Sequence, residues 1–145
     1  RGGYPELHAA TLAARRDLWA ALHDHVAAGK PLLGECGGMM ALFDRLIDKE
    51  GNPHAMAGLL PGATTMQPRL AALGTQVATL PEGEIRGHTF HYSQCATALT
   101  PLPRATKLDG KGGEAIYRVG RLTASYVHFY FPSNPHAVAA LFGNG

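Results

Sequence analysis

The segment Gly-Glu-Cys-Gly-Gly at residues 34–38 carries the side chain best suited to covalent chemistry in this chain, the thiol of Cys36. A short apolar run at residues 31–33 indicates a buried strand before it, and residues 39–46 favour a helix because they lack Gly and Pro. A cysteine in a tight turn between a strand and a helix is typical of a nucleophile elbow. The N-terminus of that helix would lower the thiol pKa and favour the thiolate. A buried structural cysteine is the alternative, and the two glycines after Cys36 favour the nucleophile.

A cysteine nucleophile needs a base, and His128 is the histidine best placed to supply one. It follows a predicted strand at residues 121–127 and lies within an aromatic segment, residues 126–131. In α/β folds, catalytic groups gather at the carboxyl ends of strands. An imidazole there could accept the proton of Cys36 and return it to a departing amine. A histidine packed in an aromatic cluster is the alternative.

The other histidines do not form a metal-binding pattern. His23 and His25 are two residues apart on a predicted helix and point to different faces. His88 and His91 have an odd spacing on a predicted strand and therefore lie on opposite faces. The chain has no Cys-x-x-Cys or His-Glu-x-x-His motif, so we predict no metal site.

Composition indicates one globular domain of 145 residues, with 46% hydrophobic and 17% charged residues. The net charge of +2 and the scattered basic residues argue against binding to nucleic acid or a membrane surface. No apolar stretch approaches the length of a membrane span, and no signal peptide is visible, so we expect a cytoplasmic protein. The chain opens on Arg1 without an initiator Met, so we expect part of a longer protein.

The elements that must position these groups can be predicted from periodicity and turn residues. Apolar side chains at spacings of three and four predict one amphipathic helix from residue 5 until Gly29 ends it. Residues 48–62 are expected to be a loop, and residues 69–73 a helical turn. Two strands follow at residues 75–80 and 84–93.

The C-terminal part of the sequence favours paired strands and a last helix. Residues 100–113 are expected to form a surface loop rich in Pro, Gly and charges, followed by a hairpin whose turn is at Val119 and Gly120. Asn134 is a suitable cap for a helix that begins at Pro135. Strands and helices alternate early and strands pair late, which predicts an α/β class with a mixed sheet.

Five segments in this order resemble one family, the glutamine amidotransferase domain of cobyrinate (or hydrogenobyrinate) a,c-diamide synthase. They are residues 2–6, 35–39, 58–62, 85–93 and 125–131. The resemblance implies a flavodoxin-like, class I (triad-type) amidotransferase domain over residues 1–145, C-terminal to an ATP-binding synthetase domain. It also implies that the first strands of the domain precede Arg1. Glutamine would be hydrolysed at Cys36, and the ammonia would amidate the a and c carboxylates of a corrinoid in cobalamin biosynthesis.

The resemblance also implies roles for individual residues. Cys36 would attack the glutamine amide, and His128 would act as base and then as acid. The backbone N–H groups of Gly3 and Gly37 would hold the oxyanion; for Gly3, which follows Gly2 in the sequence, a plain loop is the alternative. The segment His91, Tyr92 and Ser93 would hold the amino acid head group of glutamine.

Two departures from the family pattern matter. Triad amidotransferases usually carry a Glu two residues after the histidine, and here that position is Tyr130. A Cys–His dyad or a different orienting carboxylate is therefore expected. The chain also lacks a Gly-x-x-x-x-Gly-Lys phosphate loop, so ATP and Mg²⁺ are expected in the synthetase domain and no cofactor in this chain. The alternatives are another Cys–His amidohydrolase of this fold and a noncatalytic partner-binding module.

Overall fold

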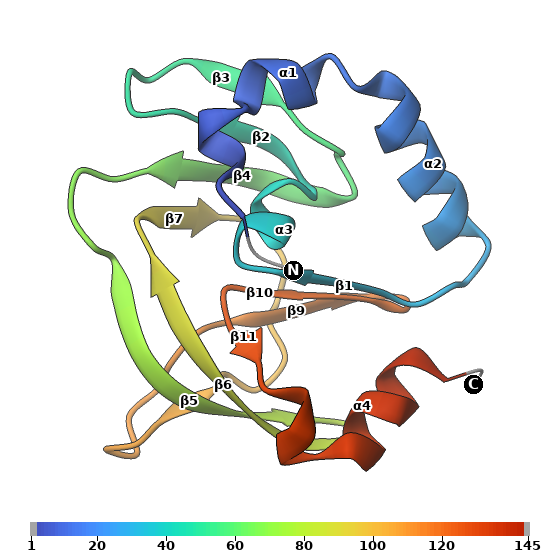
Figure 1. Ribbon diagram of the computed structural model, residues 1–145, viewed down its shortest axis with the longest axis vertical. Helices are drawn as coiled ribbons and strands as arrows, with labels where there is room; N and C mark the ends of the chain where they lie inside the picture. Colours follow the sequence, from blue (N-terminus) through green and yellow to red (C-terminus); the bar gives the residue numbers. More distant parts are fainter. Residues whose placement is uncertain (1–2, 144–145) are drawn as a thin grey trace.

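The strand that leads to Cys36 is paired in parallel with a strand from the C-terminal third of the chain. The computed structural model describes residues 3–143, and in it β1 (Leu32–Glu35) pairs with β10 (Leu122–Ser125). The register places Glu35 beside Ser125. β9 (Ile116–Val119) pairs antiparallel with β10 and completes a three-stranded sheet (Figure 1). Because β1 and β10 are parallel, the chain leaves both of them at the same edge, where Cys36 and His128 follow.

A long antiparallel hairpin forms the second sheet. β5 (Ala72–Leu80) and β6 (Gly83–His91) pair along their whole length, with β11 (His128–Phe129) beside β6 and β8 (Thr106–Lys107) beside β5. Gly87 is opposite Phe129, and a Cβ there would collide with Val127 and with the carbonyl of His128. The glycine therefore lets β11 approach β6 closely, which fixes the backbone that carries His128.

The third sheet contains elements that the sequence analysis did not predict. Its order is β3 (Pro53–Ala55), β2 (Phe43–Ile47), β4 (Leu60–Met66) and β7 (Ser93–Ala96), with β2 and β4 parallel. The helix predicted over residues 39–46 is therefore wrong beyond α3 (Gly37–Met40), and the loop predicted at 48–62 contains β3 and the start of β4. Strand pairing overrides local helix propensity here, since Phe43 and Leu46 become fully buried in the core.

The N-terminal helical region is broken, where one continuous helix was predicted. It comprises the short 3₁₀ turn η1 (Pro5–Leu7), α1 (Ala9–Ala13) and α2 (Arg16–Ala27), with a non-helical backbone at Arg15 (φ −82°, ψ 58°). Leu18, Leu22 and Val26 of the predicted apolar face pack on the core, whereas Leu7, Thr11 and Ala14 are exposed and Leu12 packs in their place. Gly29, with φ +72°, ends this region as expected. No helix within residues 3–143 is long and apolar enough to cross a membrane.

Several local predictions are confirmed. The β9–β10 hairpin forms as predicted, although its two-residue turn is at Gly120 and Arg121, one residue later than expected, because Val119 still pairs with Leu122. The helix α4 (Pro135–Phe142) is capped by Asn134, whose side chain accepts a hydrogen bond from the Ala137 N–H at 3.1 Å. The 3₁₀ turn η2 (Phe131–Ser133) precedes it. The helical turn predicted at 69–73 is wrong, because β5 begins at Ala72. The strand predicted at 84–93 divides at Tyr92, since β6 and β7 belong to different sheets.

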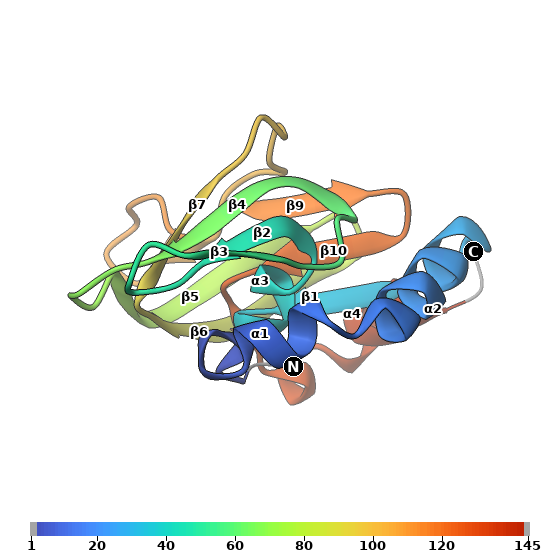
Figure 2. The same cartoon turned by 90° about the horizontal axis from the view of Figure 1, so that it is seen from above.

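The arrangement of layers confirms an α/β class with parallel and antiparallel strand pairs. Figure 2 shows α1, α2 and α4 gathered on one side of the molecule and β4, β7 and β9 on the other. Two buried apolar clusters fill the interior. One lies around α3, β2 and β4, and the other lies between the β5–β6 hairpin and α4. Cys36 belongs to the first cluster, whereas Val127 and Phe129, on either side of His128, belong to the second, so each cluster anchors one of the two site residues.

Candidate active site

Cys36 occupies a strained turn between β1 and α3, as the sequence predicts for an elbow. Its backbone has φ 50° and ψ −112°, and it is the one non-glycine residue with positive φ among residues 3–143. Such a conformation costs on the order of 1–3 kcal/mol and persists only where the surroundings impose it. The Cys36 N–H donates to the Ser125 carbonyl at 2.8 Å, and the Cys36 carbonyl accepts from Met40 N–H at 3.0 Å. The neighbouring sheet and helix therefore hold the thiol in place.

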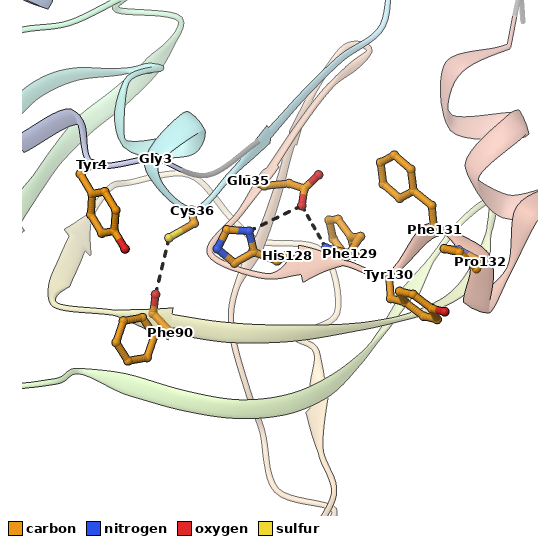
Figure 3. Close-up of a pocket in the computed structure, with 10 residues that line it drawn as sticks. All are labelled: Gly3, Tyr4, Glu35, Cys36, Phe90, His128, Phe129, Tyr130, Phe131 and Pro132. Carbon is orange, nitrogen blue, oxygen red and sulfur yellow. Dashed lines mark hydrogen bonds and ion pairs between the residues drawn. The ribbon is translucent and has the colours of Figure 1, made fainter.

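Two adjoining cavities surround the thiol. The larger, of about 610 Å³, is lined by Gly3, Tyr4, Glu35, Cys36, Phe90, His128 and residues 129–132 (Figure 3). The smaller, of about 230 Å³, shares Gly3, Tyr4, Cys36 and Phe90 and adds His91, Tyr92 and Ser93. Every residue predicted for the site except Gly37 thus lines one of the two cavities. An amino acid side chain in either cavity would reach the sulfur.

His128 lies beside Cys36 with its ring between the thiol and a carboxylate. In Figure 3 the imidazole lies between the sulfur of Cys36 and the side chain of Glu35, with Nδ1 toward Glu35 and the other ring nitrogen on the Cys36 side. The distance from Nδ1 to Glu35 Oε2 is 4.0 Å. Burial lowers the pKa of His128. The Glu35 carboxylate raises this pKa, and the nearby His88 lowers it further, but burial has the largest effect. The imidazole is therefore neutral at pH 7 and able to accept a proton.

The pKa of the Cys36 thiol is raised, whereas the sequence analysis expected it to be lowered. Burial raises the pKa of Cys36, and the hydrogen bond from the Gly37 N–H only partly offsets this rise. The thiol donates instead to the Phe90 carbonyl at 3.7 Å. The predicted lowering by the helix N-terminus is outweighed because α3 has only four residues and the sulfur is out of water. The resting pair is thus a neutral thiol and a neutral imidazole, and the thiolate forms only by proton transfer.

The two glycines predicted as oxyanion donors are packed against each other next to the thiol. A Cβ on Gly37 would lie 2.5 Å from the Gly3 carbonyl oxygen and 2.8 Å from Pro5 Cδ, so only glycine fits there. Gly3 lines both cavities, and nothing lies within 4 Å of the position that its Cβ would take. Gly2 lies outside the described residues. The Gly37 N–H therefore bonds to the sulfur, and Gly3 lies in the wall of both cavities beside it.

The segment 91–93 lines the smaller cavity, but two of its side chains are engaged elsewhere. His91 is buried, bonded through Nδ1 to the Ser93 carbonyl (2.9 Å) and through Nε2 to Glu114 Oε1 (2.7 Å). Its ring stacks on Tyr126 with centroids 3.6 Å apart, and the Ser93 hydroxyl is 2.8 Å from the Tyr126 hydroxyl. Contacts from this segment to a ligand would therefore come from Tyr92 and the backbone. Both ring nitrogens of His91 are occupied, which makes it a poor base for Cys36.

Three residues of this region were missed by the sequence analysis. Glu114 and Tyr126 hold His91, and Glu35 contacts His128. Glu35 had one detectable signal, since it is a charged residue at the end of a buried strand immediately before Cys36. Residues 3–143 contain no group of three or more His, Cys, Asp or Glu that could hold a metal ion.

The comparison with protein-family models decides the family. The model of the CobB/CobQ-like glutamine amidotransferase domain matches residues 1–136. The chain belongs to the CobB/CobQ-like glutamine amidotransferase family. The resemblance inferred from the sequence motifs is thereby confirmed, and an elbow cysteine beside a histidine is the arrangement that such an enzyme domain needs.

Curated relatives of this chain are named hydrogenobyrinate or cobyrinate a,c-diamide synthases. It is 54% identical over 141 residues to a hydrogenobyrinate a,c-diamide synthase of Pseudomonas aeruginosa and 53% identical over 141 residues to one of Stutzerimonas stutzeri. It is 46% identical over 142 residues to a cobyrinate a,c-diamide synthase of Herminiimonas arsenicoxydans. Each match covers 97% of this chain and 32%, 33% and 32% of the relatives, respectively. The chain thus spans about a third of the length of these relatives.

Proposed function

We propose that this chain hydrolyses glutamine and supplies ammonia to an ATP-dependent carbon–nitrogen ligase of cobalamin biosynthesis. The ligase would amidate the a and c carboxylates of cobyrinate or hydrogenobyrinate, the reaction for which the relatives are named. The observation that carries the proposal is the strained elbow of Cys36, which opens on a cavity shared with His128. Both cysteines are free, which is typical of proteins in a reducing compartment, and we place the reaction in the cytoplasm.

The reaction begins with a proton transfer, since the thiol is neutral at rest. Cys36 gives its proton to His128 as the sulfur attacks the side-chain amide carbon of glutamine. The negative charge that develops on the amide oxygen is stabilised by the N–H groups of Gly37 and Gly3. His128 then donates the proton to the amide nitrogen, the C–N bond breaks, and ammonia leaves. Water, deprotonated by His128, attacks the thioester, which releases glutamate and restores the thiol.

The partners follow from the same proposal. Glutamine binds in the cavities beside Cys36, with its head group near Tyr92 and the backbone of residues 91–93. The acceptor carboxylates of the corrinoid, together with ATP and Mg²⁺, bind in an N-terminal synthetase domain. Glutamine hydrolysis itself uses none of them, so this chain needs no cofactor for its step.

Labelling with a glutamine-shaped diazoketone, 6-diazo-5-oxo-norleucine, tests the glutaminase proposal. We expect one modification, at Cys36, which excess glutamine prevents. Cys95 serves as an internal control, because burial raises the pKa of its thiol to about 11 and makes it unreactive at neutral pH. Labelling that glutamine does not prevent would favour another amidohydrolase. Absence of labelling would favour a noncatalytic partner-binding module.

A second test concerns the oxyanion donor at Gly3. Gly3→Pro removes the backbone N–H, whereas Gly3→Ala keeps it and has free space for its methyl group. We expect Gly3→Pro to lower kcat for glutamine hydrolysis by about 10²-fold, the usual effect of losing one such donor. Gly3→Ala should retain near wild-type activity. Equal activities of the two variants would exclude the Gly3 N–H as a donor.

A further inference from the structure

Glu35 is a buried carboxylate that the proposed glutaminase reaction does not yet use. It ends β1 directly before Cys36, and its side chain is only 7% exposed. Burying a carboxylate is costly unless partners compensate for the lost hydration. Here Oε2 accepts a hydrogen bond from the Phe129 N–H at 3.0 Å and lies 4.0 Å from His128 Nδ1 (Figure 3). Both partners belong to β11, so the fold delivers this carboxylate to the histidine.

We propose that Glu35 is the positioning residue for His128, in place of the carboxylate that usually follows the histidine in sequence. Its side chain would hold the proton of the neutral imidazole on Nδ1, which leaves the other ring nitrogen free to accept the proton of Cys36. It would also stabilise the imidazolium that forms as the sulfur attacks. This inference rests on the proposed glutamine hydrolysis and adds the group that orients its base.

The surroundings of His128 favour Glu35 over other candidates. Tyr130, at the position where the carboxylate is usual, is 62% exposed and lacks a carboxylate. Glu114 is occupied by His91 and Thr89. Glu6 lines only the smaller cavity, whereas Glu35 and His128 both line the larger one. Among the described residues, Glu35 is the carboxylate that lies within 4.0 Å of the His128 ring.

The geometry also explains how the pair would respond to proton transfer. At 4.0 Å the contact is longer than a hydrogen bond, so at rest the negative charge of the carboxylate, rather than a hydrogen bond, favours the tautomer with the proton on Nδ1. Once His128 is protonated, the attraction between the two charges shortens the contact. The Phe129 N–H anchors Oε2 during this change, so the carboxylate keeps its position at the end of β1.

The charges around His128 set the sign of the expected pH effect. Burial and His88, whose ring centroid is 6.3 Å away, favour the neutral imidazole, while Glu35 favours the charged form. The titratable side chains Cys36, Tyr4 and Tyr130 line the same cavity. Removing the charge of Glu35 should therefore lower the pKa of His128 further. Because the base must be neutral, the acidic limb of kcat/KM then moves to lower pH.

Glu35→Gln tests the proposal in the full-length protein. The amide oxygen can still accept from Phe129 N–H, so the substitution removes the charge and keeps the anchor. We expect kcat for glutamine hydrolysis to fall about 10- to 100-fold. The acidic limb of kcat/KM and the NMR titration of the His128 ring should both move to lower pH. Glu82→Gln is the matched control, since Glu82 is a partly buried carboxylate paired with Arg118 outside both cavities, and should change neither.

Two outcomes would overturn the proposal. The first is a kcat of Glu35→Gln equal to that of the wild type. The second is a lower kcat with an unchanged pH titration of His128, because this would show that Glu35 has only a structural role. A measurement on the wild-type chain covers the case in which the variant does not fold. ¹⁵N shifts of neutral His128 should report the proton on Nδ1, and a proton on Nε2 would contradict the proposal. If the titration and tautomer are as expected but neither protein hydrolyses glutamine, the proposed function fails and the positioning role stands.

Discussion

In the ATP-dependent ligase proposed above, replacing Cys36 by Ser is expected to abolish glutamine-dependent amidation of the corrinoid. Ammonia-dependent amidation should persist, because the proposed synthetase site would need only free ammonia. Serine keeps the size and position of the side chain in the elbow, but its hydroxyl is far less acidic than a thiol and forms no useful nucleophile beside a neutral imidazole. The measurement is diamide formation with glutamine or with ammonium chloride as nitrogen source.

Cys95→Ser is the matched control for this prediction. Cys95 lies on β7 opposite Thr64 of β4, and it lines neither cavity next to Cys36. Both activities should remain near those of the wild type. Glutamine-dependent turnover of Cys36→Ser at the wild-type rate would rule out Cys36 as the nucleophile.

The second large effect is expected for His128→Asn, which should lower kcat for glutamine hydrolysis by about 10³-fold or more. The physical reason is the raised pKa of Cys36, since a buried thiol without a neighbouring base is almost fully protonated at neutral pH. As the pH rises toward that pKa, thiolate forms without a base. Alkaline pH should therefore restore part of the activity of the variant. The measurement is glutamate release as a function of pH.

His88→Asn provides the control for the loss of a histidine from this region. His88 is paired with His128 across β6 and β11, but it is exposed and lines neither cavity next to Cys36. At pH 8 the His128 imidazole is neutral with or without His88, because burial is the main cause of its lowered pKa, so the replacement should leave kcat within about twofold of wild type. If kcat fell equally in His88→Asn and His128→Asn, the β6–β11 pairing would be sensitive to any substitution. That result would contradict the proposal that His128 acts specifically as the base.

The sequence by itself determined the features that depend on neighbouring residues. The elbow at Cys36 follows from a short apolar strand and two glycines, and the β9–β10 hairpin, predicted to within one residue of its turn, follows from the turn chemistry of Gly120. The cap at Asn134 needs only the residues next to it. The family was also predictable, because its motifs are short segments that retain their order along the chain.

Tertiary structure decided what depends on residues far apart in the chain. Residues 43–46 favour a helix locally, yet they form β2 because β3 and β4 offer partners on both sides and a core for Phe43 and Leu46. The pKa of Cys36 is raised rather than lowered because burial, a property of the folded chain, outweighs a four-residue helix. Glu35 and His128 are 93 positions apart, and only the parallel pairing of β1 with β10 brings the carboxylate to the histidine.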